Sequence, residues 1–241
     1  MNRCLIVGAS SDLAINYLKK KSKKSNKFVL LVRDKEKLKL RFSENSFEEI
    51  ISLNLSNECD VDSFFKSYKN EFNNIIFYNG IDIIKPVQFY NIDDIKDSFN
   101  VNIISTIIII SNLLKSKSIN KYSSIVIISS ISGNVIGAKG HSLYSSTKSA
   151  ISGLVRSLAT ELASKKIRIN SIMPGLIETQ NLFLKNKNLL SLGEFELYKK
   201  KYPLGIGSPD NLSDLIDFLV DNKSKWITGQ NIILDGGFTL N

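Results

Sequence analysis

The sequence has few residues of the kinds that bind metals or form disulfides. It has two cysteines and one histidine, His141, in 241 residues. Cys4 lies in an apolar stretch and Cys59 in a polar one, without a CxxC spacing, so neither a disulfide framework nor a thiolate metal site is predicted. A single histidine disfavours a histidine-based metal centre, and also Ser-His-Asp catalysis unless His141 is itself the base. We expect no bound metal and a reducing, cytoplasmic location.

The sequence also lacks a long hydrophobic run. The most apolar stretch, Ile103 to Leu114, has about a dozen residues, some of them polar, against the ~20 needed to span a bilayer. The early apolar stretch Cys4 to Val7 is too short for the core of a signal peptide. We therefore expect a buried helix at Ile103 to Leu114, no membrane partner and no secretory signal.

Positive charge, by contrast, is abundant, with a net charge of +9. The lysines are scattered and are not interleaved with aromatic residues as in a nucleic-acid-binding module. They belong either to a solvated surface or to a site for an anionic ligand such as a phosphate-bearing cofactor. We expect no nucleic-acid partner.

Apolar runs alternate with helical stretches along the chain. Strands are expected at Cys4–Val7, Phe28–Val32, Ile50–Leu53, Ile75–Tyr78, Ile125–Ser129, Ile167–Ile172 and Asn231–Leu234, and helices at Leu13–Lys24, from Asp34, and at Cys59–Tyr68, Asp93–Lys115, Tyr144–Ala163 and Pro209–Val220. Continuous apolar strands between helices indicate a parallel sheet covered on both faces. We predict a single α/β domain over residues 1–241, with a doubly wound sheet that binds ligands beyond the carboxyl ends of its strands.

Tyr144 and Lys148 are four residues apart in a predicted helix, which places a phenol and an ammonium on one face. A free tyrosine, with a pKa near ~10, transfers protons poorly at neutral pH, whereas a neighbouring cation stabilises its phenolate. Chance pairs of this spacing are common on exposed helices, so the context of the pair decides its meaning.

Gly8 ends the first predicted strand just before the first helix. A glycine at this turn lets backbone N–H groups and the helix N-terminus approach a pyrophosphate. Asp12 stands where a further glycine is usual. It either caps the helix or places a carboxylate where a phosphate is expected.

Seven landmarks, in order, make the chain resemble the short-chain dehydrogenase/reductase family, and in particular its 3-oxoacyl-acyl-carrier-protein reductase-like members. The landmarks are the Gly8 loop, Asn79-Gly80-Ile81, Val101-Asn102, Ile128-Ser129-Ser130, Tyr144 with Lys148, Asn170 to Gly175 with Thr179, and Ile227 to Gln230 with Asp235-Gly236-Gly237. The resemblance covers essentially the whole chain. It implies a Rossmann-type fold and an NAD(P)-dependent enzyme that transfers a hydride between a nicotinamide and a ketone or secondary alcohol.

The resemblance also implies roles for individual residues. Tyr144 would be the general acid or base, Lys148 would lower its pKa and hold the nicotinamide ribose, and Ser130 would orient the substrate oxygen. Asn102 would hold a water that links Lys148 to solvent. The purely structural alternatives are a strand-end hydroxyl for Ser130 and a buried, backbone-bonded amide for Asn102. The residues expected to contact the cofactor are Gly8, Ser10, Ser11, Asp12, Leu13, Arg33, Asn54, Leu55, Asn79, Gly80, Tyr144, Lys148, Pro174, Gly175, Ile177 and Thr179.

The chain departs from the family pattern at three places. Ser130 lies fourteen residues before Tyr144, one more than is common, so the loop Gly133 to Ser142 carries an extra residue and Ser129 is an alternative to Ser130. Phe77 and Tyr78 replace the asparagines that usually brace the sheet. Asn54-Leu55 replaces the more usual Asp-Val near the adenine.

The end of the second predicted strand bears on the choice of cofactor. A carboxylate there would bond the ribose 2′-hydroxyl of NAD, but the chain has Val32 followed by Arg33. The arginine fork suits a phosphate. We expect NADP to be preferred, with NAD possible, although Asp34 either pairs with Arg33 or caps the next helix.

The segment of about 176–203 is expected to form a substrate loop or, alternatively, a helical surface excursion. The substrate is expected to be a small carbonyl or alcohol compound, free or linked to a carrier or nucleotide. An acidic acyl carrier would be met by the basic residues Lys117, Lys121, Lys165, Lys166 and Arg168, which are otherwise solvated helix ends.

A homodimer or homotetramer is expected by resemblance, with Ile107 to Ile110 either in its interface or facing the sheet. The alternative to an enzyme is a nucleotide-sensing or scaffold protein on the same fold.

Overall fold

Seven strands form one parallel sheet in the computed structural model, which describes residues 3–21, 27–42, 47–179 and 192–240. The strands are β1 (Arg3–Val7), β2 (Lys27–Val32), β3 (Glu49–Ser52), β4 (Phe72–Phe77), β5 (Ile119–Ile128), β6 (Arg168–Pro174) and β7 (Asn231–Leu234). Their order is β3-β2-β1-β4-β5-β6-β7, and every neighbouring pair is parallel. The direction of winding reverses between β1 and β4, where such sheets bind their ligands. The predicted doubly wound α/β fold is confirmed.

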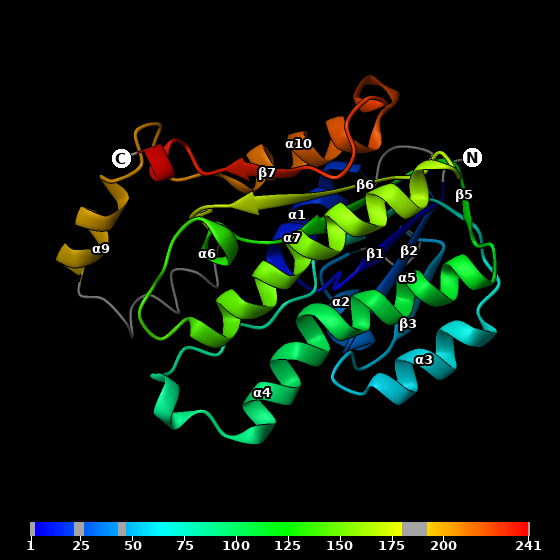
Figure 1. The fold of residues 1–241 in the computed structure, drawn as a ribbon, viewed down its shortest axis with the longest axis horizontal. Helices are drawn as coiled ribbons and strands as arrows, with labels where there is room; N and C mark the ends of the chain where they lie inside the picture. The colour runs from blue at the N-terminus through cyan, green and yellow to red at the C-terminus, as the bar shows by residue number, and fades with distance from the viewer. Residues whose placement is uncertain (1–2, 22–26, 43–46, 180–191, 241) are drawn as a thin grey trace.

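Helices cover both faces of the sheet (Figure 1). They are α1 (Asp12–Lys21), α2 (Lys35–Lys39), α3 (Glu58–Ser67), α4 (Ile92–Phe99), α5 (Ser105–Lys115), α6 (Ile131–Asn134), α7 (Ser142–Ala163), α9 (Leu192–Lys199) and α10 (Pro209–Val220). Short 3-10 turns lie at η1 (Val87–Phe89), η3 (Asn222–Ser224) and η4 (Phe238–Leu240). Helices α3, α5 and α7 pack on one face, and α1 and α10 pack on the other.

Neighbouring residues of β1 enter two different cores. Leu5 and Val7 pack with α3, α5 and α7, whereas Cys4 and Ile6 pack with α1 and α10. All four side chains are buried. Because successive side chains point to opposite faces of a strand, a strand covered on both faces must be apolar throughout. This requirement explains the unbroken apolar run in the sequence.

The helix expected over Asp93–Lys115 is divided by a π-helical turn, η2 (Asn100–Ile104), between α4 and α5. The turn contains Asn102, and such turns occur often at functional sites. The local sequence has no glycine or proline to announce it. The periodic apolar pattern therefore predicted the helical stretch correctly but not its interruption.

The stretch Ile92–Lys115 is the one described helical segment that is long and apolar enough to cross a membrane by those criteria, and half of its most apolar window is buried in the fold. Ile109 and Ile110 lie in the core against the sheet. Ile107 is exposed and Ile108 is partly buried. The segment is thus a core helix, as expected, and the residues Ile107 to Ile110 divide between the sheet and the outer surface.

Candidate active site

A cavity of about 290 Å³ opens at the carboxyl ends of the strands, where the winding reverses. Among its lining residues, those expected to contact the cofactor are Gly8, Ser10, Ser11, Arg33, Asn54, Leu55, Asn79 and Gly80. Further lining residues, which the sequence did not predict, are Leu31, Val32, Leu53, Ser56, Tyr78, Ile81, Asp97 and Val101. Most of these residues are next to a predicted residue in the chain. Extending each predicted contact by one residue would therefore have identified them.

Gly8 makes the turn between β1 and this cavity. Its φ is +76°, and a Cβ atom at this position would lie 2.7 Å from the backbone nitrogen of Asn79. The N–H groups of Gly8 and Ala9 donate to the Leu31 carbonyl at 2.9 and 3.1 Å, which ties the turn to the end of β2. A side chain is therefore excluded both by conformation and by space.

Asp12 lies outside the lining of this cavity, in the first turn of α1. Its carboxylate pairs with the Arg41 guanidinium at 3.4 Å. Asp12 lines a neighbouring hollow beside Arg41 instead, and its contact with the cofactor stays a prediction.

A second hollow of about 360 Å³ lies beside the first and shares Ser10 and Arg33 with it. Lys37 and Arg41 also line this hollow, called the basic hollow below, together with the carboxylates of Asp12 and Asp34. Asp34, at its edge, accepts the Lys37 N–H at 3.0 Å as the N-cap of α2. Of the two expected alternatives for Asp34, the helix cap is the one formed.

Asn79 braces the end of β4. Its amide nitrogen donates to the Val101 carbonyl at 2.6 Å and to Thr106 Oγ1 at 3.2 Å. The bonds join the strand end to η2 and α5. Phe77 and Tyr78 carry no amide, as expected, and the next residue, Asn79, supplies an amide brace instead.

Asn102 is buried and bonds to two segments with its side chain. Its Oδ1 accepts the Ile81 N–H at 2.8 Å, and its Nδ2 donates to the Ile81 carbonyl at 3.0 Å and to Thr147 Oγ1 at 2.9 Å. The amide therefore joins the loop after β4 to α7. Both amide hydrogens are donated to groups of the protein, as in the purely structural interpretation of this residue.

Tyr144 and Lys148 lie on α7, and the end of β5 brings Ser130 to them. The Ser130 side chain approaches the Tyr144 hydroxyl and lowers the pKa of the phenol, while Ser130 Oγ accepts the Ser132 N–H at 3.2 Å. Ser129 is buried instead, and its hydroxyl donates to the Lys148 carbonyl at 3.1 Å. Of the two serines, Ser130 is therefore the one that meets the phenol, in spite of the extra residue in the loop.

Burial governs the proton affinities of this pair. It raises the pKa of Tyr144, the Asp82 carboxylate raises that pKa further, and the Ser130 side chain opposes both. Burial lowers the pKa of Lys148 to about 8, against the opposing effect of Asp82. Lys148 Nζ donates to the Ile128 carbonyl at 2.9 Å and lies 5.7 Å from the centroid of the Tyr144 ring. The phenol is therefore protonated at neutral pH in this arrangement, and the expected lowering of its pKa by Lys148 is not found.

The other residues expected at the cofactor lie at the carboxyl end of β6 or in α1. Pro174 ends β6, and a Cβ atom on Gly175 would lie 2.9 Å from Asp235 Cβ. Ile177 is buried and bridges to Gly207. Leu13 packs against the core of α1 and α10, and Thr179 lines a small hollow that also contains Asp12.

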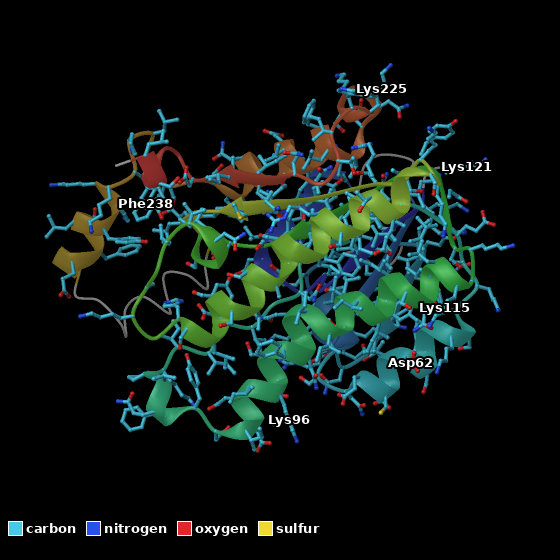
Figure 2. The ribbon with its side chains drawn as sticks, in the orientation of Figure 1. Asp62, Lys96, Lys115, Lys121, Lys225 and Phe238 are labelled. Carbon is cyan, nitrogen blue, oxygen red and sulfur yellow. The ribbon has the colours of Figure 1, made fainter. Side chains whose placement is uncertain are left out.

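Part of the expected substrate loop, residues 180–191, lies outside the described residues. Its far end is fixed by Tyr202, whose ring stacks on Phe238 at a centroid distance of 4.5 Å. The Tyr202 hydroxyl accepts the Leu176 N–H at 3.0 Å. Figure 2 shows Phe238 in the C-terminal segment near α9. The two ends of the loop are thus tied together by one tyrosine.

The basic residues considered for an acyl carrier lie at the amino ends of strands β5 and β6. Figure 2 shows Lys121 at the opposite end of the molecule from Phe238. Arg168, the first residue of β6, is buried, and its Nη2 donates to the Asp221 carbonyl at 3.3 Å. These residues are therefore far from Tyr144, and Arg168 is not a solvated helix end.

Comparison with known proteins identifies the family. Residues 19–239 match the family described as enoyl-(acyl carrier protein) reductase. The chain is 29% identical over 242 residues to carbonyl reductase family member 4 of Xenopus tropicalis, covering 98% of both chains. It is 30% identical over 191 residues to 3-oxoacyl-(acyl-carrier-protein) reductase of Aquifex aeolicus, covering 78% of this chain and 75% of that one. A short-chain dehydrogenase family protein of Francisella tularensis superposes with a TM-score of 0.87 at 27% identity, covering 100% of both chains. The chain belongs to the short-chain dehydrogenase/reductase family.

As a short-chain dehydrogenase/reductase, the protein is an oxidoreductase of the class that uses nicotinamide dinucleotides on CH–OH and C=O groups. Neighbours of the same fold have been solved with NADH in one case and NADPH in another. The residues present fit such a cofactor, because Gly8 leaves a turn that a Cβ atom would fill and the adjoining cavity lies at the reversal point of the sheet.

Proposed function

We propose that the protein is an NADP-preferring carbonyl reductase that converts a ketone to a secondary alcohol, with Tyr144 as its proton donor. The observation that carries the proposal is the half-buried Tyr144, which Ser130 approaches and which lies one helical turn from the buried amine of Lys148. The family assignment supplies the class of reaction.

The cofactor supplies the hydride when it is bound. Ser130 would orient the substrate oxygen toward the Tyr144 hydroxyl. Because burial keeps that hydroxyl protonated, Tyr144 begins as an acid and gives its proton to the oxygen as the alcohol forms. In the reverse direction the phenolic oxygen of Tyr144 would accept the proton of the alcohol. Lys148 would hold the ribose hydroxyls, and its low pKa suits proton exchange near neutrality.

We assign the two hollows to different parts of the cofactor. Gly8, Ser10 and Ser11 would hold the pyrophosphate, Asn54 and Leu55 would contact the adenine, and residues Pro174, Gly175, Ile177 and Thr179 would line the nicotinamide end. The basic hollow favours NADP, since Arg33 lies between both hollows and Lys37 and Arg41 add positive charge. A 2′-phosphate would find three cations there, of which Arg41 is paired with Asp12, while Asp34 caps α2.

The substrate would lie between Tyr144 and the loop of about 176–203. We also propose a homodimer or homotetramer in the cytoplasm, with the outward side chain of Ile107 in its interface.

The alternative of a non-enzymatic nucleotide sensor or scaffold rested on Asp12 and on the additional residue between Ser130 and Tyr144. Asp12 pairs with Arg41 outside the first cavity and Ser130 meets Tyr144, so neither observation favours it.

The test combines binding with turnover. Fluorescence titration should show tighter binding of NADPH than of NADH, and a panel of ketones should then be reduced with NADPH. Tyr144→Phe should lower turnover by about 10²–10⁴-fold and leave NADPH affinity within about twofold. Undiminished turnover in that variant would remove Tyr144 from its role, and absence of binding to either nucleotide would favour the non-enzymatic scaffold.

A further inference from the structure

Asp82 and His141 form a polar pair beside Tyr144 that the proposed chemistry leaves unused. His141 Nδ1 lies 3.7 Å from Asp82 Oδ1. The rings of His141 and Tyr144 meet edge to face, with centroids 6.1 Å apart. His141 Nδ1 is buried and has no hydrogen-bond partner among the described residues. The pair joins the loop after β4 to the loop before α7, next to the phenol.

The loop after β4 is held rigidly where it approaches the site. The two bonds from Asn102 fix both the N–H and the carbonyl of Ile81, immediately before Asp82. Two residues before Asp82, a Cβ atom on Gly80 would lie 3.1 Å from Lys148 Nζ. The segment that contains Asp82 therefore contacts the buried amine directly.

The loop before α7 is fastened to the same segment. The Gly140 carbonyl accepts the Lys85 N–H at 3.0 Å and the Tyr90 hydroxyl at 2.8 Å. Gly140 has a φ of +78°, and a Cβ atom there would lie 3.0 Å from Ile84 Cγ2. The glycine thus allows a close approach that places His141 on Asp82. This loop is one residue longer than is usual in the family. The extra residue lies between Ser130 and Tyr144, in the segment that contains His141.

The charge of Asp82 has a physical use at this position. Lys148 is only 4% exposed, and a buried ammonium is stable only when an anion or strong acceptors compensate it. Asp82 acts on Lys148 and Tyr144 alike, and in both cases it favours the protonated form. The other charged groups on the adjoining segments are Lys85, whose amine pairs with Asp94 at 2.6 Å, and Lys139.

We propose that Asp82 is a positioning residue whose carboxylate lies beside the Tyr144–Lys148 pair and compensates the buried Lys148 amine, and that His141 holds this carboxylate against the site. The inference rests on the proposed function, because it takes Tyr144 and Lys148 as the groups that transfer the proton. It deepens that function by naming a carboxylate outside the proposed catalytic set that compensates the charge of Lys148.

The test follows Lys148 itself and needs neither cofactor nor substrate. In protein with ¹³C-labelled lysine, the resonance that titrates near pH 8 is assigned to Lys148 by its loss in Lys148→Arg. Asp82→Asn should lower the midpoint of that titration by about 0.5–1 pH unit, because the ammonium loses a stabilising anion. Asp82→Ser should do the same. The matched control is Asp93→Asn, which removes an exposed carboxylate from the first turn of α4 and should leave the midpoint in place.

His141 is tested in the same titration. His141→Ala should lower the midpoint by less than Asp82→Asn does, and the double variant should go no lower than Asp82→Asn alone. Additive shifts would show that His141 acts independently of Asp82 and would overturn its holding role. An unmoved midpoint in both folded Asp82 variants would overturn the inference as a whole. Loss of turnover in Tyr144→Phe would stand in either case, so the two proposals fail separately.

Discussion

The two ends of the parallel strands are built in different ways. At the carboxyl ends, Gly8 turns in a left-handed conformation, hydroxyl and amide groups face the hollows, and Lys148 is buried. At the amino ends, ion pairs such as that of Arg3 with Glu48 join neighbouring segments near the surface. The carboxyl ends accept a left-handed glycine turn and buried polarity, which suit binding and proton transfer, whereas the amino ends contribute stability. Substitutions at the two ends should therefore change different properties.

The largest difference is expected between two adjacent serines at the end of β5. Ser130→Ala should lower turnover by about 10²–10³-fold, because the substrate oxygen loses a polarising hydrogen bond. Ser129→Ala should leave turnover within about twofold and lower the free energy of unfolding by about 1 kcal/mol, because its hydroxyl bonds only the Lys148 carbonyl. Initial rates and urea unfolding measure both. Equal losses of turnover would make the approach of Ser130 to Tyr144 irrelevant.

Gly8→Ala should lower the free energy of unfolding by about 3 kcal/mol. The reason is the positive φ together with a Cβ contact of 2.7 Å with backbone that cannot move away. Gly137→Ala is the matched control, since nothing lies within 4 Å of the Cβ atom it would add. Thermal unfolding of both variants checks this. A stable Gly8→Ala protein would mean that the turn at the carboxyl end of β1 is not strained.

Arg33→Gln should weaken NADPH binding by about 10–100-fold and leave NADH binding within about twofold, through loss of charge-assisted bonds to the 2′-phosphate. Arg41→Gln should act in the same direction but less, since part of its charge is used by Asp12. Lys39→Gln, on α2 but outside both hollows, serves as the control. If fluorescence titration shows equal losses for the two nucleotides, the basic hollow does not select NADP.

The smallest effect is expected at the amino end of the sheet. Arg3 donates to both carboxylate oxygens of Glu48, at 2.9 and 2.6 Å, and this bonding lowers the pKa of Glu48. A lowered carboxyl pKa stabilises the fold above the ordinary pKa range of glutamate, and the contribution disappears as the pH falls through the folded value. Glu48→Gln should therefore cost about 1 kcal/mol at neutral pH and nothing in strong acid, with turnover unchanged. An equal loss at both extremes of pH in chemical unfolding would contradict the ion pair as its cause.

Local sequence patterns predicted the elements well because those patterns have short-range causes. The seven apolar runs became seven strands, although β5 begins at Ile119 rather than Ile125 and β6 extends to Pro174. The division of one expected helix by η2 escaped prediction, since no residue in Asn100–Ile104 marks a break. Tertiary bonds to Asn79 and Ile81 use the atoms that this turn presents.

The arrangement of the site was only partly contained in those patterns. The spacing of Tyr144 and Lys148 follows from helix geometry and needed no tertiary information. The partnerships of Ser130 with Tyr144, of Asp12 with Arg41 and of His141 with Asp82 join residues that lie far apart in the chain or on loops. No local preference encodes which of two adjacent serines meets a given helix.

By itself, the sequence determined the alternation of strands and helices, the doubly wound parallel sheet and the family. The spacing of apolar residues, the apolar runs and the ordered motifs are all properties of the linear chain. The tertiary structure alone decided which polar groups are buried together and which charges are compensated. Those outcomes depend on loop length, sheet twist and the packing of α7 over β5, which bring together side chains that the linear order keeps apart.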